Sequence, residues 1–241
     1  MKIISWNCNG AFRKKFERIS AFNADIYIIQ ECEDPKQTRH QEYREWGQNH
    51  LWIGDSKNRG LGIFAQSDIN LEPLEWSNNY RDHSVKYFLP CLVNRDFQLL
   101  GVWTHRNKSP NFGYMGQFWK YLKTNLHLFQ KIIIAGDFNN NAIWDQWDRW
   151  WNHSDVVKIL GQRQINSVYH EEMHEAQGEE STPTFFLQKN AERPYHIDYF
   201  FKSPHFETRS FKIGQYEDWI DICDHVLQKA STNNEIKFIE P

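Results

Sequence analysis

The sequence predicts an α/β fold in which mixed β-sheets are covered by helices. The chain opens with two short apolar runs, residues 2–6 and 25–30, around a segment with helical spacing, which is typical of a strand–helix–strand unit. The middle of the chain is different, because β-rich runs follow one another there with short connections, as antiparallel strands do. With 40% hydrophobic and 16% aromatic residues, the 241-residue chain can bury a substantial core.

The expected elements follow in order along the chain. Between the opening strands, four apolar residues recur at helical spacing: Phe12, Phe16, Ile19 and Phe22. Further strands are expected at 61–65, 85–93, 97–105, 131–135, 196–202, 205–213 and 226–230. Two helices are expected, at 113–130 and at 154–166, the second with Ser154 as its N-cap. Parallel and antiparallel signals in one chain favour mixed sheets covered by helices.

Composition limits the class of protein. The chain carries 28 basic and 31 acidic residues, so it lacks the overall basic excess of a protein that coats DNA, although a local basic groove is compatible with this balance. No repeat, low-complexity tract or linker divides the sequence, and a single domain over residues 1–241 is expected. Four scattered cysteines, the lack of a signal peptide and the lack of a bilayer-spanning run favour a cytoplasmic protein with no stable membrane association, and no obligate protein partner is evident.

Polar residues cluster where the predicted strands end. Strand ends in layered α/β folds commonly meet at one rim, so these side chains are expected close together: Asn7, Glu31, His105, Asp137, Asn139, Asp198, Asp224 and His225. Each one alone would more often be a cap or turn residue. Asp198 differs, because its apolar neighbours predict that it faces inward, and a buried carboxylate needs a partner such as a histidine.

The residue types suit phosphoryl chemistry. Carboxylates are hard oxygen ligands for Mg²⁺ or Mn²⁺, and the absence of cysteine clusters argues against structural zinc. Asparagine can hold a phosphate oxygen without adding negative charge. A histidine paired with a carboxylate can exchange protons near neutral pH. A metal, a histidine and neutral donors are together what a charged phosphodiester transition state requires.

Five short blocks stand in a recognisable order. They are WNCNG at 6–10, QE at 30–31, GDFN at 136–139, IDY at 197–199 and DH at 224–225. This order resembles the endonuclease/exonuclease/phosphatase superfamily, which includes deoxyribonuclease I, exonuclease III-type abasic endonucleases, sphingomyelinases and inositol polyphosphate 5-phosphatases. The resemblance implies a four-layer α/β/β/α sandwich of two mixed β-sheets flanked by helices. It also implies hydrolysis of phosphodiester bonds with Mg²⁺ or Mn²⁺ as the cofactor.

The resemblance further implies a metal-binding side of the site. Glu31 is similar to the principal metal ligand of the superfamily, with Asn7 beside it. Asp224 is similar to a second carboxylate on the metal side. One departure from the pattern is Cys223, since most members carry serine before the DH pair.

The other matched residues are implied to carry the chemistry. Asp137 and Asn139 resemble the pair that orients or deprotonates water and holds the phosphate. His225 resembles the histidine that contacts the phosphate, oriented by Asp198. His105 falls where the deoxyribonuclease I branch has a second histidine, and the exonuclease III branch has a tyrosine there.

The neighbours of His105 favour nucleic acid as the substrate. Arg106, Asn107 and Lys108 supply two cations and an amide donor beside the predicted site, which suits a phosphate backbone. Nucleic-acid phosphodiester hydrolysis is therefore the main hypothesis. The alternatives are a phosphatase or phosphodiesterase acting on a lipid or small molecule, and a non-catalytic binding module that kept the fold.

A tryptophan-rich stretch follows the GDFN block. Trp144, Trp147 and Trp151 are spaced at i, i+3 and i+7, which predicts one face of a helix directed to the core. The alternative is a stacking platform for bases, because every base offers a π-face.

Overall fold

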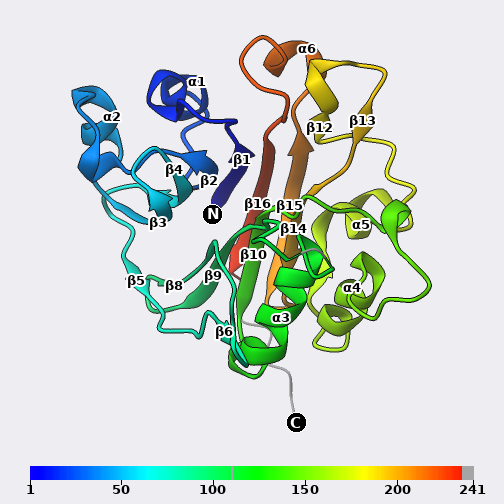
Figure 1. Ribbon diagram of the computed structural model, residues 1–241. Helices are drawn as coiled ribbons and strands as arrows, with labels where there is room; N and C mark the ends of the chain where they lie inside the picture. Colours follow the sequence, from blue (N-terminus) through cyan, green and yellow to red (C-terminus); the bar gives the residue numbers. More distant parts are fainter. Residues whose placement is uncertain (110, 235–241) are drawn as a thin grey trace.

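Two six-stranded β-sheets lie face to face with helices on both outer faces, as Figure 1 shows. The computed structural model describes residues 1–109 and 111–234. The first sheet has the order β15 (Phe206–Ile213), β16 (Gln228–Asn234), β1 (Lys2–Asn7), β2 (Ile26–Cys32), β4 (Arg59–Ala65), β3 (His50–Ser56). The second has the order β11 (Asn166–Ser167), β14 (Asp198–Lys202), β10 (Ile132–Asp137), β9 (Phe97–Trp103), β8 (Phe88–Val93), β5 (Leu71–Pro73). This confirms the four-layer α/β/β/α arrangement.

Both sheets mix parallel and antiparallel pairs. In the first sheet β1 runs parallel to β2 and antiparallel to β16. In the second, β10 runs parallel to β9 and antiparallel to β14. Two small hairpins lie outside the sheets, β6 (Asn79–Tyr80) with β7 (His83–Ser84), and β12 (Phe185–Phe186) with β13 (Pro194–Tyr195).

The helices are short and divide between the two outer faces. In Figure 1 α1 and α2 lie on the side of strands β1 to β4, whereas α3 and α4 lie on the opposite side. The α-helices are α1 (Phe16–Ser20), α2 (Gln41–Trp46), α3 (Met115–Asn125), α4 (His153–Gly161), α5 (Val168–Met173) and α6 (Tyr216–Trp219). The 3₁₀ turns are Phe12–Lys14, Pro35–Gln37, Leu126–Leu128, Ala142–Trp144 and Leu187–Lys189. Within residues 1–109 and 111–234, no helix has the length and apolar character to cross a membrane.

Side-chain alternation along the strands creates three apolar layers. In β1, Ile3 packs between the two sheets while its neighbour Ile4 packs under the helices outside the first sheet, because successive strand residues point to opposite faces. In β10, Ile133 and Ile134 divide in the same way between the central layer and the layer beneath α3. Each fully buried isoleucine contributes roughly 1.5–3 kcal/mol, so these layers fix the strand ends that carry the polar residues.

The sequence locates the central strands better than the helices. The expected strand at 85–93 begins only at Phe88, and β4 and β8, two successive β-rich runs of the middle of the chain, lie in different sheets. The first helix is interrupted at Lys15, between the 3₁₀ turn and α1, and ends before Phe22. Ser154 is not the N-cap of α4, which begins at His153 because the Asp155 carboxylate accepts a hydrogen bond (2.9 Å) from the Asn152 backbone N–H. That helix ends at Gly161, well before the expected residue 166.

The predicted helix through the tryptophan run is wrong. Only one 3₁₀ turn (Ala142–Trp144) forms there, followed by turns up to α4. Trp147 is 96% exposed, so it is not a core residue, and Trp144 is 41% exposed. Trp151 is stacked on Phe112 with 3.9 Å between centroids, and Trp144 packs against Tyr195 at 5.2 Å. Spacing at i, i+3 and i+7 is ambiguous in this stretch, because its charged residues interrupt the apolar face.

Candidate active site

The two sheets contribute polar side chains to one shared end of the sandwich. Asn7 ends β1 in the first sheet, and its side-chain Nδ2 donates a 2.8 Å hydrogen bond to Oδ2 of Asp137, which ends β10 in the second. Asp137 stands directly opposite Asp198 in the antiparallel pairing of β10 with β14. Residues 130 positions apart in the sequence are therefore joined at this end of the sandwich.

Asp137 is fully buried and is held by three donors. Besides Asn7, the backbone N–H and the side-chain Nδ2 of Asn139 each donate to its carboxylate at 2.7 Å. Asn139 adopts a left-handed conformation (φ 46°), which folds its side chain back toward Asp137. Burial, followed by the negative charge of Asp198, raises the pKa of Asp137 to about 7, although the donors and His225 oppose that shift.

Asp198 and His225 form a buried pair. Nδ1 of His225 lies 3.0 Å from Oδ2 of Asp198, and the two side chains are 7% and 4% exposed, respectively. Burial on its own would lower the pKa of His225, but the charge and hydrogen bond of Asp198 outweigh it and raise that pKa to about 9. Because Nδ1 is engaged, Nε2 is the ring nitrogen left for a ligand. The sequence-based expectation of a histidine partner for Asp198 agrees with this contact.

Neighbouring side chains hold His225 and Asp198 in place. The indole Nε1 of Trp6 donates to the His225 carbonyl at 3.1 Å, and the ring of Phe185 packs 4.5 Å from the His225 ring. The side chain of Gln228 donates to the Asp198 carbonyl at 2.7 Å. These neighbours hold the pair in one geometry, which is what a proton-handling histidine requires.

Three of these side chains could share one cation. Ligand atoms of Asp137, Asp198 and His225 all lie within 4.8 Å of one another. This grouping differs from the predicted metal-side set, because Glu31 and Asp224 fall outside it. Two buried carboxylates in one space repel each other, and a divalent cation would relieve that repulsion, so the donor set fits a hard metal ion.

Glu31 approaches the same region from the first sheet. The pairing of β2 with β4 is irregular between Gln30 and Cys32, and Glu31 lies at that irregularity with a φ of 64°. Such bulges redirect a side chain, and backbone strain at this position is typical of functional sites. The carboxylate of Glu31 lies 3.4 Å from Nδ2 of Asn7, so it reaches the edge of the cluster and can act as an additional oxygen ligand.

Arg59 is a charged neighbour that the sequence did not identify. Its Nη2 lies 2.6 Å from Oε2 of Glu31, and its guanidinium lies over the ring of Trp103 at 5.4 Å. Arg59 begins β4, in the hairpin after β3, where a lone arginine resembles any solvated turn residue. Only the pairing of β2 with β4 brings it to Glu31, so no signal in the sequence could have found it.

Asp224 lies at the outer edge of the site. Its Oδ1 accepts a 2.9 Å hydrogen bond from Nδ2 of Asn9, which belongs to the WNCNG block. The thiol of Cys223, next to it, donates to the backbone oxygen of Asn7 at 3.1 Å and so performs the hydrogen bonding available to the serine more common at that position. The DH and WNCNG blocks are therefore physically connected.

The segment after β9 forms another wall. The ring of His105 packs against Tyr87 and Trp103 at 5.6 and 5.4 Å, and burial, followed by the charge of Arg59, lowers the pKa of His105. Asn139 connects this wall to the cluster, because its Nδ2 also lies 3.2 Å from the carbonyl of Thr104.

The three predicted substrate contacts differ in what their side chains do. Arg106 and Lys108 are exposed, and no carboxylate lies within 4 Å of either among the described residues. Asn107 instead donates to the Ser84 carbonyl at 2.8 Å and to the Gln117 side chain at 2.9 Å. Both of its N–H donors therefore hold the loop, and the two cations are the groups free for a substrate.

Solved structures with this fold include nucleases and a protein solved with a DNA product. The chain is similar to a 3'-5' exonuclease from Neisseria meningitidis, with a TM-score of 0.70, 17% identity and coverage of 97% of this chain and 100% of that one. It is also similar to an AP endonuclease from Archaeoglobus fulgidus (TM-score 0.64, 14% identity, 97% and 99% coverage). A third is D. rerio TDP2 complexed with a single-strand DNA product (TM-score 0.64, 16% identity, 97% and 98% coverage).

The sequence itself carries the family assignment. No curated protein sequence matches the chain. The model of the "Endonuclease/Exonuclease/phosphatase family" matches residues 4–225, a span that contains all five blocks. The chain therefore belongs to the endonuclease/exonuclease/phosphatase family, whose members are phosphoric ester hydrolases.

Proposed function

We propose that this protein is a divalent-metal-dependent phosphodiesterase that cleaves nucleic acid by metal-assisted attack of water. The observation that carries the proposal is the close packing of Asp137, Asp198 and the Asp198-bonded His225 at the end of the sandwich, beside Asn7 and Glu31. A purely structural cluster would avoid two adjacent buried carboxylates, because their repulsion destabilises the fold. A reaction that passes through a negatively charged phosphorus centre has a use for this arrangement.

Each side chain has a proposed role. Glu31 and Asn7, with Asp224 on the metal side, would hold Mg²⁺ or Mn²⁺ against the two inner carboxylates, and the bound ion supplies Lewis-acid stabilisation of the phosphate. Asp137 orients the attacking water and accepts its proton, with Asn139 holding a phosphate oxygen. His225 donates through Nε2 to the phosphate while Asp198 fixes its orientation. His105, on the opposite wall, is placed to assist the leaving oxygen.

Nucleic acid is the proposed substrate class. The uncompensated cations Arg106 and Lys108 suit a chain of phosphates rather than one small ester. The similar proteins from Neisseria, Archaeoglobus and D. rerio include an exonuclease, an AP endonuclease and one solved with a DNA product. The four cysteines are free thiols, which fits the proposed cytoplasmic location.

A second candidate is removal of terminal phosphates. The Neisseria protein is also described as a 3' phosphatase bound to a product DNA hairpin. Hydrolysis of a phosphomonoester requires the same metal and histidine but no strand beyond the phosphate. A lipid or other small phosphate ester is the remaining alternative.

A substrate panel tests these options. Plasmid DNA, single-stranded DNA, abasic duplex, 3'-phosphorylated DNA, RNA, phosphatidylinositides and sphingomyelin would each be incubated with Mg²⁺ or Mn²⁺, with EDTA as the control. The proposal predicts metal-dependent cleavage of an internal nucleic-acid diester as the fastest reaction. Faster release of phosphate from the 3'-phosphorylated strand, or faster hydrolysis of a lipid, would replace it with the corresponding alternative.

A further inference from the structure

Two adjoining cavities lead away from the candidate active site. The first, about 230 Å³, is lined by Asn140 and Arg106, each one residue beyond Asn139 and His105. The second, about 510 Å³, shares Ser109 and Asn111 with the first, and its volume lies within the ~300–1,000 Å³ typical of ligand sites. We call the two cavities together the side groove.

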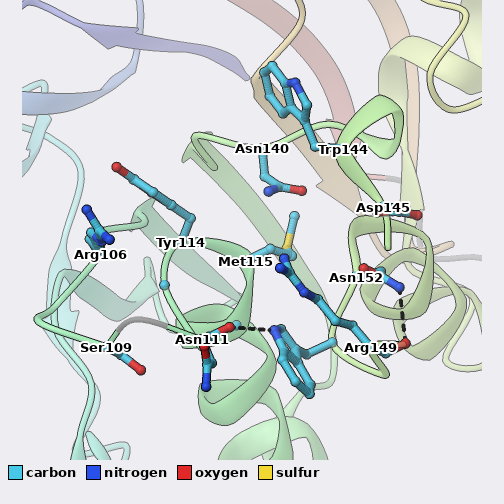
Figure 2. Close-up of a pocket in the computed structure, with 13 residues that line it drawn as sticks. Arg106, Ser109, Asn111, Tyr114, Met115, Asn140, Trp144, Asp145, Arg149 and Asn152 are labelled. Atoms are coloured by element: carbon cyan, nitrogen blue, oxygen red, sulfur yellow. Dashed lines mark hydrogen bonds between the residues drawn. The ribbon is translucent and has the colours of Figure 1, made fainter. Parts of the chain in front are cut away.

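Aromatic rings are spaced along the side groove. Trp144 and Tyr114 flank Asn140 at the first cavity in Figure 2, and they are 41% and 40% exposed. Trp150, 61% exposed, lines the second cavity. Trp151, which also lines the first cavity, is anchored, since its Nε1 donates to the Asn111 carbonyl at 3.0 Å. Exposed aromatic rings beside an immobilised tryptophan offer flat apolar surfaces on which the planar rings of a ligand can stack.

The charge of the side groove is positive although the chain as a whole carries −3. Arg106 and Arg149 line the first cavity, and Arg81 and Lys120 line the second. Asp145 is the one carboxylate among the described lining residues, and it accepts hydrogen bonds from the first backbone N–H groups of α4 at 2.8 and 3.1 Å. The cations of the side groove are thus left to an anionic ligand.

Lys120 is the most informative of these cations. It is only 6% exposed, and its Nζ lies 4.8 Å from the centroid of the Phe112 ring. Within residues 1–109 and 111–234, no carboxylate lies within 4 Å of it. The stem of Lys120 is thus largely buried while the residue lines the second cavity, so a phosphate there would supply the counter-charge that the described residues do not.

We propose that the side groove binds a single-stranded stretch of nucleic acid that continues from the scissile phosphate, with bases stacked on Trp144 and Trp150 and a phosphate on Lys120. This proposal rests on the function proposed above and narrows its substrate class. Alternating aromatic faces and cations are how proteins hold unpaired strands without reading their sequence. In a duplex the bases stack on one another, so their faces are not available to these rings.

Strand binding in EDTA tests the side groove without any cleavage. The protein would be titrated into a fluorescent 12-nucleotide poly-dT strand and into a matched duplex, with anisotropy as the measurement. Trp150→Ala is expected to weaken single-strand binding about tenfold, since base stacking on one ring contributes that order of affinity. Trp147→Ala is the matched control, because Trp147 is 96% exposed but lines neither cavity, and it should leave the affinity within about twofold.

Salt dependence tests the phosphate contact. Lys120→Met keeps the buried stem while removing the charge, and it should reduce the slope of log K against log salt by about 0.7, the value for one phosphate contact on a single strand. Lys158→Met, on the exposed face of α4, should leave the slope unchanged. Thermal unfolding of each variant identifies any that fails to fold, and Arg81→Ala provides a second, exposed position for the same slope measurement.

The outcomes distinguish failure of the groove proposal from failure of the proposed function. Equal affinity for duplex and single strand, or equal losses for Trp150→Ala and Trp147→Ala, would overturn the groove proposal. Binding of liposomes rather than oligonucleotides, lost in Trp150→Ala, would overturn it in favour of a membrane-facing patch. Hydrolysis of bis-p-nitrophenyl phosphate by the unaltered protein depends on the active site alone, so its absence would count against the proposed function while leaving the binding measurement valid.

Discussion

Two buried polar clusters lie in this protein, and they are built in opposite ways. The catalytic cluster, so named for the role proposed above, consists of Asp137, Asp198 and His225. The Glu180 cluster is a chain of side chains beneath the loop after β10: His153, Gln177, His170, Glu180 and Asn141. Both are enclosed by aromatic rings and both contain acids and histidines, so residue type and burial do not distinguish them.

The direction of the carboxylate pKa shift distinguishes them. In the Glu180 cluster the links are 2.8 Å from His153 to Gln177, 3.1 Å from Gln177 to His170, and 3.1 Å from His170 to Glu180. Burial opposes the charge of Glu180, but the hydrogen bonds from His170 and Asn141 outweigh it and lower the pKa of Glu180 to about 2. Its carboxylate is satisfied by the protein alone, which is the pattern of a structural network.

The catalytic cluster also has protein partners, but a second buried carboxylate, Asp198, stands beside Asp137. Burial and the adjacent Asp198 raise the pKa of Asp137 to about 7, so the fold holds a carboxyl group where its charge is disfavoured. The difference teaches that crowded like charges, rather than burial, mark the functional site. Four predictions test that distinction, in order of expected effect.

The largest effect is expected at the Asp198–His225 pair. Asp198→Asn and His225→Ala should each reduce kcat by about 10²- to 10⁴-fold, because the histidine loses either its orientation or its ring. The double variant should resemble the worse single variant, since the two act as a unit. Steady-state rates with the preferred diester measure this. Losses that multiply in the double variant would show that the two residues act independently.

A smaller loss is expected for the metal side. Glu31→Gln should lower turnover at limiting Mg²⁺ by about 10²-fold and raise the Mg²⁺ concentration needed for half-maximal rate, because a neutral amide is a poorer ligand. Glu17→Gln, an exposed substitution in α1, is the control and should keep the unaltered rate. Full activity of Glu31→Gln at limiting Mg²⁺ would remove Glu31 from the ligand set.

The Glu180 cluster should respond in the opposite way. Glu180→Gln should lower the free energy of unfolding by about 1–3 kcal/mol, because a charge-assisted hydrogen bond to His170 is lost, while the rate per folded molecule stays the same. Urea unfolding and a rate corrected for the folded fraction measure the two effects. A large loss of rate with unchanged stability would assign the cluster to the chemistry and break the comparison.

The last effect is absent at neutral pH and develops only in acid. Burial lowers the pKa of His153 from 6.5 to about 4. Between these two pH values the histidine is therefore protonated in the unfolded chain and neutral in the folded protein. Stability should therefore fall as the pH drops from about 6.5 to 4, by up to about 3 kcal/mol, and His153→Gln should flatten that part of the curve. Urea unfolding at pH 4.5, 5.5 and 7 measures this. An equally steep decline in His153→Gln would place the titrating group elsewhere.

How far the sequence predicts this molecule depends on how local the signal is. The central strands β1, β2 and β10 are continuous apolar runs, and their polar end residues were identified from order and spacing. Arg59 and Lys120 were missed, because only the tertiary structure brings Arg59 to Glu31 on β2 and places Lys120 of α3 at a cavity shared with distant residues such as Arg81 and Trp150.

The tryptophan run shows the converse error. Its spacing is helical, but Asp145 accepts hydrogen bonds from the backbone N–H groups of His153 and Ser154, and this contact draws the run into turns before α4. The rings of Trp144 and Trp150 are therefore placed by turns that this contact with the start of α4 stabilises, rather than by helix propensity. That residues 1–241 form a single domain stays a prediction.

Metal-dependent thermal stability tests the central claim most directly, because only the catalytic cluster should need a cation. With Mn²⁺ at about 100 times its Kd, the unaltered protein should gain about 2.7 kcal/mol and its Tm should rise by about 5–10 °C. Glu180→Gln should begin from a lower Tm and show the same rise, whereas Glu31→Gln and Asp137→Asn should lose most of it. No rise in the unaltered protein, or an undiminished rise in Asp137→Asn, would contradict the account.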